Sequence, residues 1–425
     1  MSNLLDIKYE KFKLENGLEV ILYQNRMLPL VSVNLWYRVG SANERPGKTG
    51  FAHLFEHMMF QGSENVGKEK HFRYIQEAGG TLNGSTSLER TNYFETLPSN
   101  NLDLALWLES DRMGFMLEGL TQEKLDNQKD VVMNERRQRY ENQPYGRAWE
   151  IIFSNLFTPD FPYHWPTIGW MEDIKNFNLN DIKEFFKTYY APNNCSIVIA
   201  GDIDDLAVKK SIEKYFGSIP GNGEVQKITK TPKELTEDII LIHKDNVQLP
   251  RLYLCWMSDK VYGLDDPALD VLSDILGSSK NSRLYKSLVY EQQIAQDVSA
   301  FQYSANLTGM FFVIITAKPD GDLQLLKKNV EDEIARLIDS GVTEDELLRT
   351  KNGIKSSYIY SLQNIEQLAN QINNYNFYLN EPNSFNYDLD RYNSLDVIQI
   401  QKIAKKYLSK PKLELSVIPK RKKTL

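Results

Sequence analysis

The residues best suited to chemistry lie in one short segment, Ala52–Phe60. It holds two of the five histidines, His53 and His57, together with Glu56. Helix-forming residues fill the segment, and positions four apart share one face of a helix. The two imidazoles can therefore bind one metal ion while Glu56, three residues after His53, points to the same side. The order His-x-x-Glu-His is typical of a zinc site in which the carboxylate between the ligands acts as a general base.

Histidines four residues apart also occur by chance, in helix cores or on helix surfaces. The neighbours of this pair favour a metal, since residues such as Leu54, Phe55 and Met58 predict a largely buried helix. Buried imidazoles and carboxylates need polar partners. A metal ion supplies them.

A catalytic zinc site needs a third protein ligand. The best candidate is Glu135, which lies far downstream of His57 in a helical pattern. From spacing alone, an ion pair between Glu135 and the adjacent Arg136 is the simpler explanation. The remaining histidines lack ligand spacing, and we expect surface or packing roles for them: His71, His164 and His243.

A mixed scaffold is predicted to position these residues. Strands are expected where β-branched and aromatic residues cluster, and helices where apolar residues recur every three or four positions. The alternation of the two in both halves of the chain indicates an α+β fold. The expected strands are 18–25, 31–40, 195–203, 238–244, 251–258, 310–318 and 413–420, and the expected helices are 100–118, 121–141, 179–189, 266–276, 322–339 and 343–378.

The two halves of the chain resemble each other. A Leu-Pro pair precedes a strand at Pro29 and again at Pro250, and a Gly-Ser pair follows a helix at Gly62 and again at Gly277. A chain of 425 residues exceeds one ordinary core, so two copies of one domain explain its length. We predict a zinc-binding domain, a linker rich in Gly, Pro, Lys and Thr, and a second domain at 1–217, 218–236 and 237–425.

Composition excludes several classes of protein. The chain is 41% hydrophobic with a net charge of −7, which argues against a disordered chain and against nucleic-acid binding. Its two cysteines, Cys195 and Cys255, cannot form a disulfide framework. No run of about 18 apolar residues is present, so we expect no membrane span. The N-terminus shows no signal peptide, which predicts a cytoplasmic protein; a periplasmic location stays open if a signal was removed.

Two motifs together resemble the M16 metallopeptidase family, the pitrilysin and mitochondrial-processing-peptidase group of inverzincins. The first is His53–His57; the second is Val131–Arg136, which matches a V-V-x-x-E-R helix of that family. The resemblance extends over nearly the whole chain, including 79–98 and 162–170. It implies one zinc ion per chain, bound by His53, His57 and Glu135, with Glu56 as general base.

The resemblance also implies a fold and a substrate. The fold would be two homologous α/β-roll domains of the LuxS/MPP-like metallohydrolase type, forming half of a clamshell around a chamber. An edge strand would bind an extended peptide by β-augmentation. Its contact residues would be Asn83, Gly84, Ser85 and Thr86. One departure from the family is Gln128, where many members carry a second Glu seven residues before the ligand.

The second domain lacks the metal ligands. Alignment at Gly277 places Ala268, Val271 and Leu272 at the positions of His53, Glu56 and His57. In self-sufficient family members this domain supplies an Arg and a Tyr seven residues apart. Those positions hold Val289 and Gln296 here, whereas Arg283 and Tyr285 belong to the scaffold part of that motif.

These absences predict a heterodimer. The chain would be the zinc-bearing subunit of an endopeptidase, and a metal-free homologous subunit would supply the Arg and the Tyr. The alternative is a structural or assembly subunit of the processing-peptidase type with little or no catalysis. The intact ligand set argues against that alternative.

Overall fold

The computed structural model describes residues 7–420 and divides the chain into two compact units. The first unit comprises the chain up to Arg136, Trp165–Ile228 and Tyr358–Asn386. The second comprises Arg137–His164, Thr229–Ser357 and the chain from Tyr387 onward. Each unit thus contains a segment from the opposite half of the sequence.

The first unit is built on a six-stranded sheet with the order β1-β2-β6-β3-β5-β4. All neighbouring strands are antiparallel except β2 and β6, which run parallel. Central strands β3 and β6 are buried along nearly their whole length. The strands are β1 (Glu10–Lys13), β2 (Glu19–Gln24), β3 (Leu30–Tyr37), β4 (Thr81–Thr86), β5 (Thr91–Pro98) and β6 (Cys195–Gly201).

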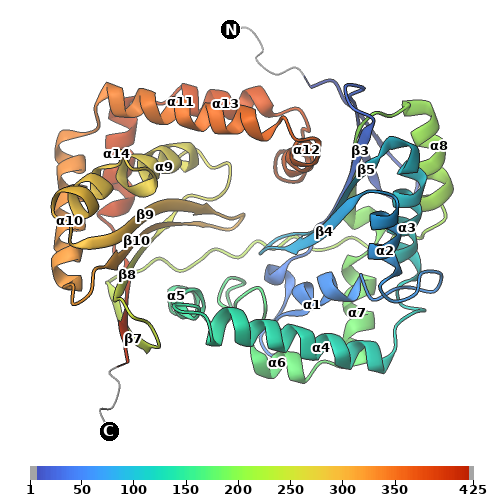
Figure 1. The fold of residues 1–425 in the computed structure, drawn as a ribbon, viewed down its shortest axis with the longest axis horizontal. Helices are drawn as coiled ribbons and strands as arrows, with labels where there is room; N and C mark the ends of the chain where they lie inside the picture. The colour runs from blue at the N-terminus through green and yellow to red at the C-terminus, as the bar shows by residue number, and fades with distance from the viewer. Residues whose placement is uncertain (1–6, 421–425) are drawn as a thin grey trace. The chain divides into compact units, whose positions relative to one another are not determined.

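Helices cover both faces of this sheet. Helices α1, α2 and α3 contact strands β3 to β5, while α12 packs against β3 and β6 (Figure 1). In this second layer, Asn373 of α12 donates a hydrogen bond to the backbone oxygen of Asn34 at 3.0 Å. The helices of the unit are α1 (Phe51–Met58), α2 (Lys70–Glu77), α3 (Leu102–Phe115), α4 (Gln122–Arg136), α6 (Met171–Lys175), α7 (Leu179–Tyr189), α8 (Asp205–Phe216) and α12 (Ile365–Leu379).

The second unit has a five-stranded sheet with the order β7-β11-β8-β10-β9. Helices α9, α10 and α14 pack on one face around a core that includes Trp256 and Phe311. On another side, α5 contacts β11, and its Trp149 ring lies 4.9 Å from that of Phe312. The elements are β7 (Ile239–Asp245), β8 (Arg251–Ser258), β9 (Ala295–Ser304), β10 (Gly309–Ala317), β11 (Leu413–Pro419), α5 (Ala148–Leu156), α9 (Asp266–Ser273), α10 (Leu323–Ser340), α11 (Glu344–Ser361), α13 (Phe385–Asn393) and α14 (Val397–Leu408).

The two sheets share one topology. The order β2-β6-β3-β5-β4 corresponds strand for strand to β7-β11-β8-β10-β9, and the single parallel pair lies at the same place in both. Strands β3 and β8 are separated along the chain by the same interval as the two Leu-Pro pairs, and helices α1 and α9 by the same interval as the two Gly-Ser pairs. The predicted duplication is therefore confirmed. The boundaries at 217 and 237 stay a prediction.

Most predicted elements are confirmed with shifts of a few residues at their ends. One prediction was wrong: the helix expected over 343–378 is two helices, α11 and α12, separated by a turn. Asn364 in that turn caps α12, because its side chain accepts hydrogen bonds from the backbone N–H groups of Glu366 and Gln367. The segment between Gly221 and Leu235 contains no helix or strand, as expected of a linker.

Candidate metal centre

Helix α1 carries three of the predicted site residues on one face. The rings of His53 and His57 lie 4.9 Å apart between centroids, as the i, i+4 spacing requires. Apolar residues on the opposite face, including Leu54, Phe55 and Met58, are almost completely buried. Packing of the apolar face therefore fixes the position of the helix. This packing also determines where the polar face, with the two histidines, lies.

Helix α4 brings the third predicted ligand to the same point. It lies beside α1 (Figure 1), and Glu135 stands in its last turn. One carboxylate oxygen of Glu135 lies 3.2 Å from Nε2 of His57 and 3.7 Å from Nε2 of His53. The three side chains are 12–25% exposed, so solvent reaches the group. We call His53, His57 and Glu135 the α1–α4 cluster.

The separations in the α1–α4 cluster fit a zinc ion. Four ligands at about 2.0–2.1 Å from a tetrahedral zinc lie about 3.3–3.4 Å from one another. The nitrogen-to-oxygen distances of 3.2 and 3.7 Å bracket that value. Two imidazoles and one carboxylate form the donor set of catalytic zinc sites with a fourth position for water. A shared metal ion would explain the position of Glu135. The ion pair with Arg136, which spacing alone favoured, is not needed to explain it.

Glu56 lies beside the cluster and is held by strand β4. The hydroxyl of Thr86 donates a hydrogen bond to Oε2 of Glu56 at 2.7 Å. Burial raises the pKa of Glu56, and this hydrogen bond opposes the rise because it stabilises the charged form. Glu56 therefore has a fixed orientation next to the predicted ligands. It takes no part in the contacts between Glu135 and the two histidines.

Strand β4 contains all four predicted substrate contacts and stands at the end of the sheet order. The strand passes very close to α1 at Gly84. A Cβ atom at this position would lie 3.2 Å from Cγ of Glu56 and 3.3 Å from the ring of Phe60. Gly84 thus lets the edge strand run directly past Glu56. Asn83, Ser85 and Thr86 flank it on the same strand.

The second unit has no corresponding ligands at the equivalent helix. Ala268, Val271 and Leu272 of α9 are buried apolar residues. Arg283 binds Glu346 through two hydrogen bonds of 2.8 and 2.7 Å, which supports the structural role expected for it. Val289 lies in the π-helical segment Tyr285–Glu291, and Gln296 is exposed at the start of β9.

Sequence reasoning missed the residues that support α1. Gly50 precedes the helix and has no side chain with which to cap it, and the first turn contains no acidic residue. Support comes instead from the carboxylates of Glu44 and Asp173, which lie outside the helix. The sequence offered one indication of this support: an acidic residue, Glu44, lies six positions before Gly50, the glycine that precedes the helix.

Comparisons with known proteins agree with this fold. A family model described as insulinase (peptidase family M16) matches residues 19–158, and one described as the peptidase M16 inactive domain matches residues 176–354. The chain belongs to the M16 peptidase family. The second of these matches covers α9, where the metal ligands are absent.

Individual relatives support the same assignment. Zinc protease PqqE of Helicobacter pylori is 31% identical over 366 residues, covering 85% of this chain and 82% of the relative. A probable mitochondrial-processing peptidase subunit beta of Arabidopsis thaliana is 24% identical over 95% of this chain and 77% of its own length. The crystal structure of a protease from Helicobacter pylori superimposes with a TM-score of 0.92 at 28% identity, covering 97% of this chain and all of that one.

Among residues 7–420, no helix combines the length and hydropathy that crossing a bilayer requires. The predicted absence of a membrane-spanning helix is therefore confirmed for the described part of the chain. The predicted cytoplasmic location stays a prediction.

Proposed function

We propose that the chain is the zinc-binding subunit of an endopeptidase that hydrolyses extended peptides. The convergence of His53, His57 and Glu135, with Glu56 beside them, carries this proposal. The names of two relatives support it, zinc protease PqqE of Helicobacter pylori and an uncharacterized zinc protease of Bacillus subtilis. The α1–α4 cluster would bind one zinc ion per chain. Zinc bound there supplies a Lewis acid that polarises the scissile carbonyl and lowers the pKa of water.

Glu56 would act as the general base. Its carboxylate is oriented by Thr86 and takes no part in the contacts between Glu135 and the histidines. It can accept a proton from the attacking water and pass it to the leaving amine. The partial burial of Glu56 raises its pKa, which favours a group that must both accept and release a proton.

Strand β4 would hold the substrate. An edge strand offers unpaired backbone groups to an extended peptide, and Gly84 brings this edge next to Glu56. A peptide added at Asn83–Thr86 would therefore run past the proposed base. This mode of binding selects for extended chains over folded proteins.

A partner subunit would complete the site. The side chain of Val289 has no hydrogen-bond donor, and Gln296 carries an uncharged amide in place of a phenol. Neither reproduces the Arg and the Tyr that the family resemblance places at these positions. We propose that a metal-free homologous subunit supplies them. The similarity to a chain named as the beta subunit of a processing peptidase is consistent with such pairing. Full peptidase activity of the purified chain alone, unchanged by a homologous subunit, would contradict this requirement.

The variant Glu56→Gln tests the catalytic proposal. It keeps the size of the side chain and removes the base, so we expect about one zinc per chain to be retained and hydrolysis to fall by about 10²- to 10⁴-fold. Metal content is measured by mass spectrometry and hydrolysis with a fluorogenic peptide. Glu64→Gln, at an exposed position, serves as the matched control. Unchanged hydrolysis in Glu56→Gln would exclude Glu56 as base, and a wild-type chain that binds no zinc would favour the assembly role.

A further inference from the structure

Helix α1 depends on residues outside itself for its N-terminal hydrogen bonds. It has only eight residues and starts after Gly50, whose φ of +93° is open to glycine and strained for other residues. No side chain within the helix caps its first turn. The backbone N–H groups there need acceptors from elsewhere, since a helix of this length is marginal without them.

The carboxylate of Glu44 provides two of these acceptors. One oxygen accepts a hydrogen bond from the N–H of Gly50 and the other from the N–H of Ala52, both at 2.8 Å. Burial raises the pKa of Glu44, and the two backbone donors oppose that rise. Ala52 immediately precedes His53, so Glu44 binds the backbone one residue away from a proposed ligand.

A second carboxylate fixes the residue that leads into the helix. Oδ2 of Asp173, in α6, accepts hydrogen bonds from the N–H and the hydroxyl of Thr49 at 3.0 and 2.7 Å. The same hydroxyl accepts a hydrogen bond from the N–H of Trp170 at 2.9 Å. The chain entering α1 is thus tied on two sides, by Glu44 from the preceding loop and by Asp173 from α6.

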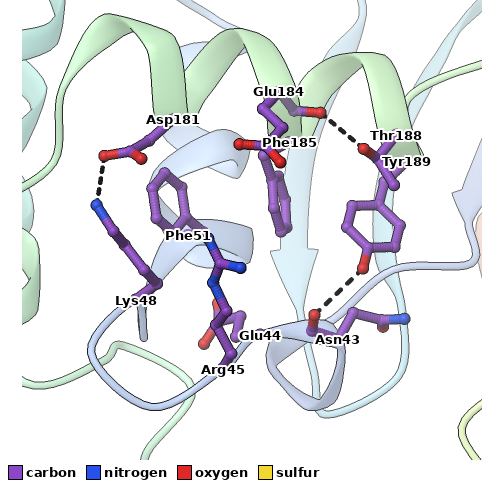
Figure 2. A pocket seen from close by; sticks show the side chains of 10 residues that line it. All are labelled: Asn43, Glu44, Arg45, Lys48, Phe51, Asp181, Glu184, Phe185, Thr188 and Tyr189. Atoms are coloured by element: carbon purple, nitrogen blue, oxygen red, sulfur yellow. Dashed lines mark hydrogen bonds and ion pairs between the residues drawn. The ribbon is translucent and has the colours of Figure 1, made fainter.

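The loop that carries Glu44 is itself fastened to α7, as Figure 2 shows. Lys48 forms an ion pair with Asp181 at 2.5 Å, and the hydroxyl of Tyr189 donates a hydrogen bond to the backbone oxygen of Asn43 at 3.2 Å. These contacts line a cavity of about 210 Å³ beside the start of α1. None of the proposed ligands lines it. The cavity therefore lies among the residues that support α1 and is separate from the proposed zinc ligands.

We infer that Glu44 is a positioning residue for the proposed zinc site, acting through the first turn of α1. One consequence follows from its contacts. The hydrogen bonds fix the rotation of the helix about its axis, which sets where His53, the third residue of the helix, and His57 project. This inference rests on the proposed function, because it concerns the same metal.

The test compares Glu44→Gln and Glu44→Ala with Glu184→Gln, an exposed carboxylate lining the same cavity. The amide of Glu44→Gln has one acceptor oxygen, so we expect its zinc dissociation constant to rise, and that of Glu44→Ala to rise more, by about 10- to 100-fold. Glu184→Gln should match the wild type. In metal-free protein, hydrogen exchange of the Gly50 and Ala52 amides should accelerate in both Glu44 variants and not in Glu184→Gln.

The outcomes separate the inference from the proposed function. If wild-type protein binds zinc and both Glu44 variants bind it equally well, with only a lower melting temperature, Glu44 is structural and the inference is wrong. If the wild type binds no zinc, the proposed function fails, and the exchange measurement alone then decides whether Glu44 holds the first turn. Should Glu44→Ala fail to fold, Glu44→Gln, which keeps the side-chain volume, decides the zinc result.

Discussion

Two groups of histidine and glutamate in the first unit have similar composition and opposite environments. The α1–α4 cluster is partly exposed and lies between two helices and an edge strand. The second group, His71, Glu95 and Glu109, also brings its potential ligand atoms within 4.8 Å of one another, but it is buried between α2, α3 and β5. We call the second group the buried cluster. Geometry alone does not distinguish the two as metal sites.

The difference lies in the charge that each cluster already contains. Arg112 lies within the buried cluster and binds both oxygens of Glu109, with Nε donating to Oε2 at 2.8 Å. Its guanidinium also stacks on the ring of Tyr93 at 4.1 Å. A positive charge is therefore already paired with one of the potential metal ligands of this cluster. Burial, with a further contribution from Arg112, lowers the pKa of His71 well below its usual value and keeps it neutral.

The comparison shows which features beyond ligand type indicate a metal. An open cluster of two imidazoles and one carboxylate has ligand atoms that can bind a metal ion, and a cation can reach them from solvent. In a closed cluster an arginine of the same chain already provides the positive charge, and solvent does not reach the ligand atoms. The α1–α4 cluster meets the first description and the buried cluster the second, so we expect zinc only in the former.

The largest effect should follow from removing a ligand of the α1–α4 cluster. Glu135→Gln replaces a charged ligand with a neutral amide, and we expect zinc affinity to fall by more than about 100-fold, beyond the loss seen when only a supporting group is changed. Glu123→Gln, exposed on the same helix, is the control. Titration with zinc and a competing chelator measures both. Stoichiometric zinc that survives Glu135→Gln would place the ion elsewhere, with the buried cluster as the first alternative.

Removing the internal cation should strongly destabilise the buried cluster. Arg112→Met leaves Glu109 buried without its partner, which typically costs about 3–5 kcal/mol. The matched control is Arg73→Met, which breaks an exposed ion pair with Glu77 and should change the free energy of unfolding very little, because solvent screens that pair. Urea unfolding followed by tryptophan fluorescence measures the difference. Equal unfolding midpoints for the two variants would mean that Arg112 does not compensate charge in the core.

The sequence predicted the α1–α4 cluster better than its surroundings, for physical reasons. His53, Glu56 and His57 are related by local helical spacing, which can be read directly. Glu135 is remote from them along the chain, so its place came from family resemblance. The buried cluster combines α2, α3 and β5, and His71 was expected on the surface or in packing. One local signal existed, since Glu109 and Arg112 are three residues apart on α3 and can therefore pair along one face of the helix.

The exchange of segments between the units could not be predicted from local pattern. An apolar stripe on α12 or α5 shows that the helix must be buried, but it does not show which sheet the helix covers. Buried strands such as β3 and β6 were predicted because β-branched and aromatic residues cluster in them. Strand β9 was missed, since polar residues interrupt its pattern.

The smallest effect should come from Glu95, whose two oxygens accept no hydrogen bond from residues 7–420 although the side chain is fully buried. Burial first, and then the charge of Glu109, raise its pKa well above the usual value. Folding therefore favours the protonated acid. Below a pH of about 4.5 the unfolded chain is protonated too, and stability is unaffected; as the pH rises further, the unfolded chain releases the proton while the folded chain retains it, so stability falls.

Glu95→Gln removes this dependence and keeps the shape of a neutral acid, with an amide N–H that can donate to Glu109 in place of the acid proton. We expect the variant to gain stability over the wild type as the pH rises above about 4.5, with the gain absent at about pH 4. Melting temperatures of both proteins at several pH values measure it, with Glu77→Gln as the exposed control. A constant difference between Glu95→Gln and wild type across this range would show that Glu95 is ionised in the fold. The buried cluster would then carry a net negative charge, which would remove the main reason to expect metal only at the α1–α4 cluster.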